Sequence, residues 1–131
     1  MTGDLLYLGV DDVLRLHARI FAIEPATARG RLRDVRALES ALTRPLNHAT
    51  YESADTAMQA AILAQGIAQS QSFVDGNKRT ALLAMTTFLA LNGWNVDIPD
   101  RRLAQRILDF ATGASPDALA DELRRDLSPR P

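Results

Sequence analysis

The segment Asp75-Gly76-Asn77-Lys78-Arg79 combines residue types that suit a site for a phosphate group. It is predicted to lie where a loop turns into a helix, and the first turn of a helix presents unpaired backbone N–H groups and a partial positive charge. Gly76 permits the tight turn before the helix. Lys78 and Arg79 lie at the unfavourable end of the helix dipole, at a cost of about 0.3–1 kcal/mol each, which favours a compensating anion.

Asp75 adds a metal ligand to this anion site. Mg²⁺ is commonly held by one or two protein carboxylates together with oxygens of a phosphorylated substrate. The segment therefore predicts a nucleotide-phosphate site with Mg²⁺. A plain helix start is the alternative interpretation, because Asp-Gly is a common turn, asparagine is a common N-cap, and basic side chains often cover helix ends.

Helical periodicity and capping residues predict the elements that position this segment. Helices are expected from Asp11 or Asp12 to before Pro25, over 35–42 after the N-cap Asp34, over about 55–70 and 77–92, over about 101–112 after the cap Asp100, and after Ser115-Pro116 as far as Leu127. Pro45 predicts a loop over Thr43–Thr50, because the residue before a proline is pushed out of the helical region. Trp94, Val96 and Ile98 alternate with polar residues and predict a short extended segment.

The helix that follows the motif, over about 77–92, is apolar nearly all round and is predicted to be the centre of the bundle. His17 lies on the apolar face of the first helix and is expected to be a satisfied, partly buried side chain. His48 is expected to be solvated in the loop after Pro45. Neither histidine has a metal-ligand partner at a useful spacing.

Size and composition favour one compact domain over residues 1–131, and the helical periodicity along the chain makes its expected fold class all-α. The chain is 47% hydrophobic and 24% charged, which is ordinary for a globular protein. Its formal net charge of -1 argues against direct nucleic-acid binding, and it has no apolar run long enough to cross a membrane. With no cysteine and no basic leader at its N-terminus, it is expected to be cytoplasmic.

The sequence SQSFVDGNKRTA at Ser70–Ala81 resembles the signature of the Doc (death-on-curing) branch of the Fic/Doc superfamily. That signature is histidine, any residue, phenylalanine, any residue, aspartate, any residue, then Asn-Lys-Arg. Five of its six positions match. Lys78 stands where the adenylylating Fic branch has a second glycine, which favours Doc. The segments Leu32–Asp34 and Leu38–Ala41 are similar to the family's second-helix pattern, and Arg44-Pro45 is similar to the start of its flap, expected over Arg44–Tyr51.

The resemblance implies the Fic/Doc helical fold and a role for each matching residue. Phe73 would anchor the motif loop, Asp75 would bind Mg²⁺, and Asn77 would form part of the phosphate nest. Lys78 and Arg79 would contact nucleotide phosphates. The implied activity is transfer of the γ-phosphoryl group of ATP, or of a nucleotidyl group, to a hydroxyl of a protein such as elongation factor Tu. The implied partner is a Phd-like antitoxin.

The departure from the signature is Gln71, which occupies the position of the family's catalytic histidine. Glutamine cannot act as a general base near neutral pH, although its amide can accept a hydrogen bond from a hydroxyl and orient it. The next position, often proline in the family, is Ser72. The alternatives are a weakened transferase, a catalytically silent module that still binds nucleotide or antitoxin, or an inactivating substitution made to allow production of a toxic protein. Another transfer reaction on the same fold is a further alternative.

Overall fold

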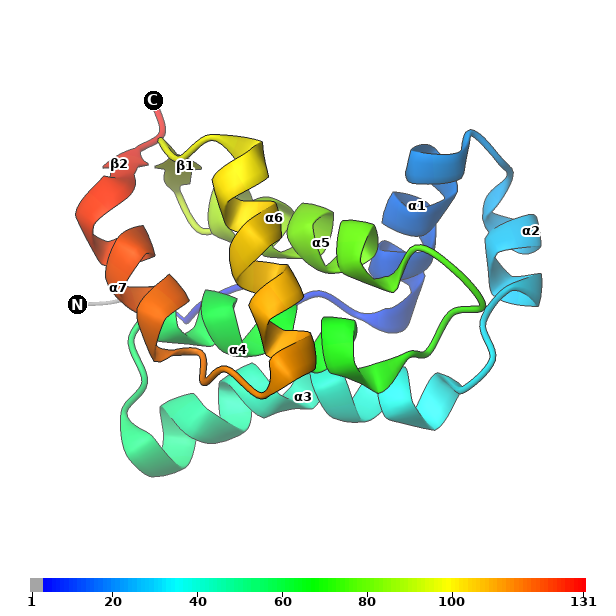
Figure 1. Ribbon diagram of the computed structural model, residues 1–131, viewed down its shortest axis with the longest axis horizontal. Coiled ribbons are helices and arrows are strands. Elements are labelled where there is room, and N and C mark those ends of the chain that lie inside the picture. Colours follow the sequence, from blue (N-terminus) through cyan, green and yellow to red (C-terminus); the bar gives the residue numbers. More distant parts are fainter. Residues whose placement is uncertain (1–3) are drawn as a thin grey trace.

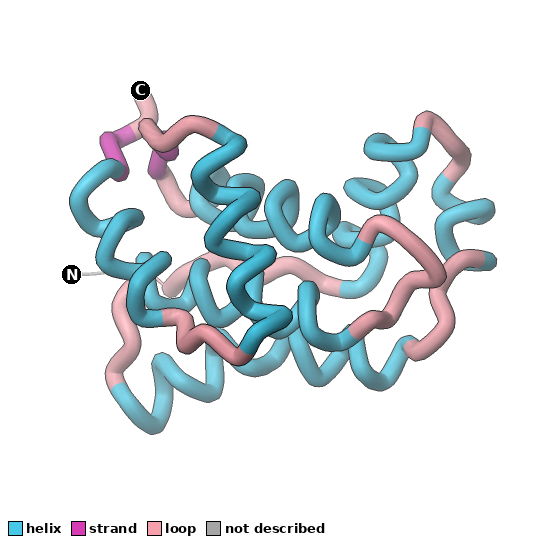
Figure 2. The backbone as a smooth tube through the Cα atoms, viewed as in Figure 1, coloured by secondary structure: helices cyan, strands magenta, loops and turns pink. Residues whose placement is uncertain are grey.

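Seven α-helices and a two-stranded sheet form an all-α fold in the computed structural model, which describes residues 4–131 (Figures 1 and 2). The predicted fold class is therefore confirmed. In chain order the elements are α1 (Val10–Phe21), α2 (Pro25–Gly30), α3 (Val35–Glu52), α4 (Thr56–Ser70), α5 (Asn77–Leu91), β1 (Trp94–Val96), α6 (Asp100–Asp109), the 3₁₀-helix η1 (Phe110–Thr112), α7 (Asp117–Asp126) and β2 (Leu127–Pro129).

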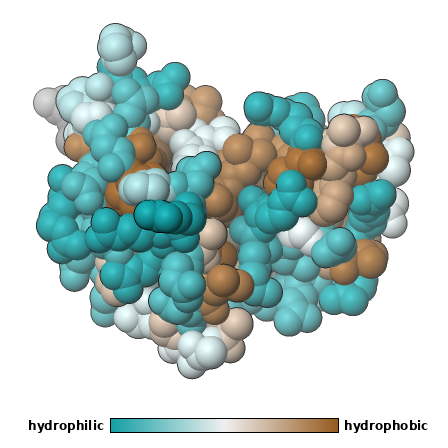
Figure 3. Space-filling view, turned by 45° about the horizontal axis from the view of Figure 1, so that its top comes forward, coloured by the Kyte–Doolittle hydropathy of each residue, from teal (hydrophilic) through white to brown (hydrophobic). Residues whose placement is uncertain are grey.

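Helix α4 lies at the centre of the fold, with α3, α5 and α7 packed around it (Figure 1). Its small residues allow close approach, and a side chain on Gly66 would come within 3.1 Å of the Cβ of Ala41 on α3. The prediction that α5 is the centre was wrong, because one side of α5 is open: Leu82 and Leu83 are half-buried and Leu91 is 49% exposed. Figure 3 shows hydrophobic surface in the hollow between the two raised sides of the molecule.

Helix α3 continues through Pro45 to Glu52, so the predicted loop over 43–50 and the expected flap over 44–51 were wrong. A proline inside a helix removes one backbone hydrogen bond and disfavours the preceding turn. Burial offsets this cost, because Leu38, Ala41, Leu42 and Pro45 are all buried in α3. The buried Pro45 is therefore accommodated within α3, and the helix continues past its predicted end.

Other elements depart from the predictions at their ends. Helix α1 begins at Val10 with Gly9 as N-cap, whose N–H donates to Asp12 at 2.8 Å, so neither Asp11 nor Asp12 is the N-cap. Residues 25–30 form the short helix α2 where a break was expected. Pro99 rather than Asp100 caps α6. Leu127 belongs to β2, which pairs antiparallel with β1.

Asp55 ties the start of α4 to α7. Its side chain accepts from the N–H of Met58 at 2.8 Å, as an N-cap does, and from Arg124 Nε at 2.6 Å. The hydrogen bond from Arg124 holds the pKa of Asp55 below its usual range, opposed by partial desolvation and helped by the N–H of Met58.

We expect Asp55→Ala to lower the free energy of unfolding at neutral pH by about 1 kcal/mol, the usual worth of an N-cap. Because the pKa is lowered in the folded state, this contribution is full above the ordinary carboxyl range and is lost as the pH falls through the lowered value. Urea unfolding at pH 7 and pH 3 measures both effects. The exposed Asp97→Ala is the control, and an equal loss for the two variants would contradict the role of Asp55.

Candidate functional site

The predicted motif forms the loop between α4 and α5, at the end of the molecule where α1 and α2 lie (Figure 1). Gln71 ends α4 with a φ of 49°, and Gly76 begins α5 with a φ of 78°. These two left-handed residues turn the chain back, so that α5 starts beside the end of α4. Lys78 and Arg79 lie in the first turn of α5, as the sequence predicted.

The segment between α2 and α3 holds the motif loop in place by backbone hydrogen bonds. Leu32 and Phe73 form an antiparallel bridge, and the N–H of Val74 donates to the carbonyl of Arg31 at 2.9 Å. The N–H groups of Arg33 and Asp34 both donate to the carbonyl of Ser72, the latter at 3.1 Å. The loop is therefore fixed by a neighbour that is remote from it in sequence.

The side chain of Asn77 makes two hydrogen bonds within the motif loop. Its side-chain oxygen accepts from the N–H of Phe73 at 2.9 Å, and its amide nitrogen donates to the carbonyl of Phe73 at 2.9 Å. With both side-chain atoms engaged in this way, Asn77 shapes the loop, while its backbone N–H belongs to the first turn of α5, where intrahelical acceptors are missing. The phosphate nest expected here would therefore consist of backbone N–H groups, and the side chain of Asn77 holds that backbone in shape.

A buried cluster of aromatic side chains packs against the motif loop. Phe73 is fully buried and stacks on His17, with ring centroids 3.9 Å apart and ring planes at 7°. Phe21 also contacts His17, at 4.9 Å between centroids. The four-residue spacing of His17 and Phe21 puts both on one face of α1, and was the available signal for this cluster.

His17 is fully buried, and its Nδ1 lies 2.9 Å from Oγ1 of Thr80. Its Nε2 has no hydrogen-bond partner among residues 4–131, so the expectation of a satisfied histidine holds for one ring nitrogen and was wrong for the other. Burial lowers the pKa of His17, Arg31 adds to this lowering, and Asp75 opposes it. The imidazole is therefore neutral at physiological pH.

The charged residues of the motif are exposed around the start of α5. Val74, Asp75, Gly76, Asn77, Lys78 and Arg79 line a cavity of about 290 Å³. Asp75 accepts from the N–H of Gly76 at 2.8 Å. The guanidinium carbon of Arg79 lies 5.4 Å from the centroid of Phe21, and that of Arg31 lies 5.2 Å from the same centroid. Arg31 thus adds a positive charge that the motif alone did not reveal.

Gln71 shares a second cavity, of about 320 Å³, with Lys78. Ile107 on α6 and Phe110, Ala111 and Gly113 in and after η1 also line this cavity. Gln71 is exposed, and its carbonyl accepts from Arg33 at 3.2 Å. The residue at the position of the missing base and one predicted phosphate ligand therefore face the same space.

The donor set fits Mg²⁺ bound together with a phosphorylated substrate. Between Asp4 and Pro131, no three His, Cys, Asp or Glu side chains gather closely enough to hold a metal by themselves. Asp75 offers one exposed carboxylate next to an anion site, and Mg²⁺ commonly takes one or two protein carboxylates plus substrate oxygens. Asp75 would hold the ion, and the phosphates would supply the remaining charge.

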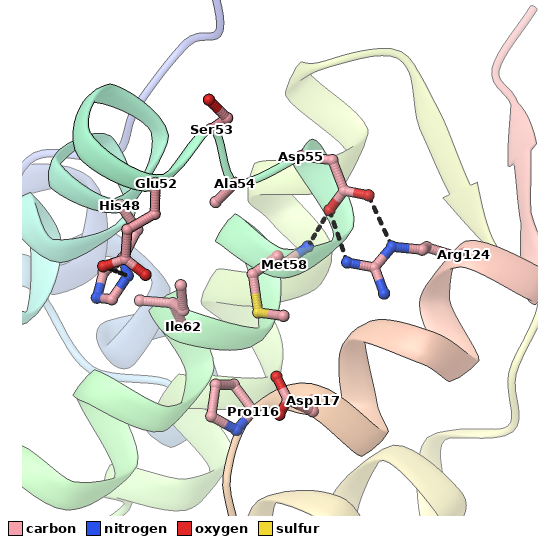
Figure 4. Close-up of a pocket in the computed structure, with 10 residues that line it drawn as sticks. All are labelled: His48, Glu52, Ser53, Ala54, Asp55, Met58, Ile62, Pro116, Asp117 and Arg124. Carbon is pink, nitrogen blue, oxygen red and sulfur yellow. Dashed lines mark hydrogen bonds and ion pairs between the residues drawn. The ribbon is translucent and has the colours of Figure 1, made fainter.

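A larger cavity of about 390 Å³ lies at the far end of α4, a helix about 22 Å long, and is a poor candidate for the same chemistry (Figure 4). Most of its ionisable groups pair with one another. Asp55 contacts Arg124, and His48 lies 3.0 Å from Glu52. His48 was expected to be solvated in a loop, but it is helical and paired.

The family model described as Fic/DOC family matches residues 7–89, which extend from before α1 into α5 and contain the whole motif loop. The chain belongs to the Fic/DOC family. It is 33% identical over 124 residues to the protein named Toxin Doc from Mycolicibacterium smegmatis (strain ATCC 700084 / mc(2)155), with 92% of this chain and 82% of that protein covered. This similarity places it in the Doc branch of the Fic/DOC family.

The Fic/DOC match ends before α6, so Ile107 and Phe110, which line the same cavity as Gln71, lie outside it. Among the described residues, no helix is both long enough and apolar enough to cross a membrane.

Proposed function

We propose that this protein is the toxin of a toxin–antitoxin pair and that it transfers a phosphoryl group from ATP to a hydroxyl of a protein. The observation that carries the proposal is the structure around Asp75–Arg79, where a carboxylate, a helix N-terminus and two cationic side chains surround one cavity. The likeness to a protein named Toxin Doc supports the toxin role.

Each residue of the site has a defined task in this proposal. Phosphoryl transfer depends mainly on positioning and on stabilising the charge of the transferred group. Lys78 and Arg79 neutralise phosphate charge, the first-turn N–H groups of α5 donate to phosphate oxygens, and Asp75 holds Mg²⁺. When bound, Mg²⁺ supplies further neutralisation of the phosphate oxygens. Gly76 lets the backbone approach the phosphates closely.

Gln71 limits the rate in this proposal. It faces the same cavity as Lys78, where its amide can orient an acceptor hydroxyl without removing the proton. We therefore propose an attenuated enzyme that transfers a phosphoryl, or alternatively a nucleotidyl, group. The second candidate is a silent module that binds nucleotide or antitoxin, and the observation that favours it is this same glutamine.

The proposed partners follow from the Doc relationship. A Phd-like antitoxin would cover the toxin, and elongation factor Tu is the proposed acceptor. The antitoxin's binding surface is not assigned to residues 44–51, because the flap expected there is the second half of α3 (Figure 1).

We expect Asp75→Ala and Arg79→Ala each to weaken binding of ATP with Mg²⁺ by at least about tenfold, since a charge-assisted contact contributes about 1.5–3 kcal/mol. Isothermal titration calorimetry with and without Mg²⁺ measures this. Removal of Mg²⁺ should weaken binding to the unchanged protein and have little further effect on Asp75→Ala.

Arg101→Ala is the matched control, because Arg101 is an exposed arginine in the first turn of another helix, α6. It should bind nucleotide like the unchanged protein. Absence of any heat of binding at millimolar ATP, for a protein shown to be folded by circular dichroism, would overturn the proposed function.

A further inference from the structure

His17 connects the beginning and the end of the motif loop. Its ring stacks on Phe73, which precedes the loop's turn, and its Nδ1 bonds to Thr80, which follows the first turn of α5. A side chain on Gly76 would also come within 3.5 Å of Cε1 of His17. One side chain from α1 therefore contacts both the motif loop, through Phe73, and α5, through Thr80, and it lies beside Gly76.

The hydrogen bond to Thr80 distinguishes His17 from an ordinary core residue. Burying an imidazole with one ring nitrogen unpaired costs free energy that an apolar ring at the same place would avoid. The polar atom that is paired bonds to α5, the helix whose first turn carries Lys78 and Arg79. A hydrogen bond has a fixed direction, whereas apolar packing alone allows two surfaces to slide.

Phe73 links the contact with His17 to the backbone of the motif loop. Its backbone N–H and carbonyl are both bound by Asn77, and its backbone pairs with Leu32. The His17 ring fixes the Phe73 side chain from one side, and the bond to Thr80 fixes the start of α5 from the other. The relative placement of loop and helix, on which a phosphate site depends, is set between these two contacts.

We propose that His17 is a positioning residue of the phosphate site, and that its hydrogen bond to Thr80 keeps the first turn of α5 in place against Phe73. The functional consequence of this inference rests on the proposed function. The groups that His17 would position are the backbone N–H donors of α5 and the side chains of Lys78 and Arg79. His17 itself touches no substrate in this proposal.

The test compares His17→Phe, Thr80→Val and the double variant. Phenylalanine keeps a ring against Phe73, and valine keeps the shape of threonine without its hydroxyl. Each single change leaves a buried polar partner behind, whereas the double change removes both and is expected to restore much of the stability. Thermal unfolding, calorimetry with Mg²⁺ and ATP, and amide hydrogen exchange of residues 73–79 without nucleotide are measured for each.

We expect the double variant to regain thermal stability relative to the single variants while binding ATP at least about fivefold more weakly and exchanging the loop amides faster. Thr80→Ser, which retains the hydroxyl, should bind ATP nearly normally. His48→Asn changes the other histidine of the chain, which is far from the loop, and should alter neither readout. Should His17→Phe fail to fold, the contrast between Thr80→Val and Thr80→Ser decides.

Normal ATP affinity and normal loop exchange in a stable double variant would show that the hydrogen bond serves stability alone, and would overturn the proposal. If the unchanged protein binds no nucleotide, the proposed function fails by itself. Hydrogen exchange of residues 73–79 then decides the positioning role of His17 independently, with unchanged protection in the double variant as the contrary outcome.

Discussion

Replacing Gln71 by histidine is expected to raise the rate of phosphoryl transfer by about 10²–10⁴-fold, because a positioned general base contributes about that much. The backbone should accept the change. Gln71 has a φ of 49°, and histidine is one of the residues enriched in this left-handed region. The side chain is exposed and faces the cavity shared with Lys78, so an imidazole there can reach a bound hydroxyl.

Nucleotide affinity should change little in Gln71→His, since the groups proposed to bind phosphate lie beyond it at 75–79. Growth arrest, and phosphate incorporation into elongation factor Tu, are compared for the two proteins at equal expression. Mass spectrometry of the acceptor distinguishes an added phosphoryl group from an added nucleotidyl group. The matched control is Gln69→His, which puts an imidazole at another residue that lines the same cavity.

Background activity in Gln71→His, with ATP still bound, would show that the missing histidine is not the cause of silence. The binding module, or another transfer reaction, would then be the better account. Equal gains from Gln71→His and Gln69→His would show that any imidazole in the cavity suffices, which contradicts a positioned base.

The second large effect is expected at Gly76, where alanine should lower the free energy of unfolding by about 2–5 kcal/mol and weaken ATP binding. A left-handed backbone costs an ordinary residue about 1–2 kcal/mol. The new Cβ would in addition lie 2.5 Å from Cε2 of Phe21, and overpacking adds about 1–3 kcal/mol. Moving Phe21 disturbs Arg79, whose guanidinium lies over that ring.

Gly113→Ala separates the two causes. Gly113 has a φ of 91°, but nothing lies within 4 Å of an added Cβ. Urea unfolding should therefore show only the backbone part of the loss for this variant. Gly76→Ala combined with Phe21→Leu, which makes room, should recover part of the lost stability. Equal losses at Gly76 and Gly113 would contradict the contact with Phe21.

The candidate site was largely predictable because its residues are consecutive. Asp75–Arg79 lie at the start of a helix whose first residue, Asn77, was predicted correctly. Asp34 and Asp55 were likewise identified as starting points of α3 and α4, and both accept a hydrogen bond as N-caps. Local chemistry decides such features, since capping bonds and left-handed glycines involve residues within one turn of each other.

The errors occurred where a distant contact outweighed a local preference. Pro45 predicts a helix end, yet its burial against α4 carries α3 seven residues further. The flap was placed on residues 44–51 because Arg44-Pro45 is similar to the start of the family's flap. In the structure the segment that pairs with the motif loop is 31–34, which no spacing in the sequence singled out.

The sequence by itself predicted which residues could bind a phosphate, where α5 begins, and that Gln71 stands at the position of the family's histidine, because these depend on residue type and on neighbours along the chain. The tertiary structure alone decided how that segment is held. His17 bonds to Thr80, which is 63 positions away in the sequence. Leu32 pairs with Phe73, and residues of η1 line the same cavity as Gln71. Burial of one shared core brings these residues together. The sequence pattern of a single helix does not indicate which other helix will pack against it.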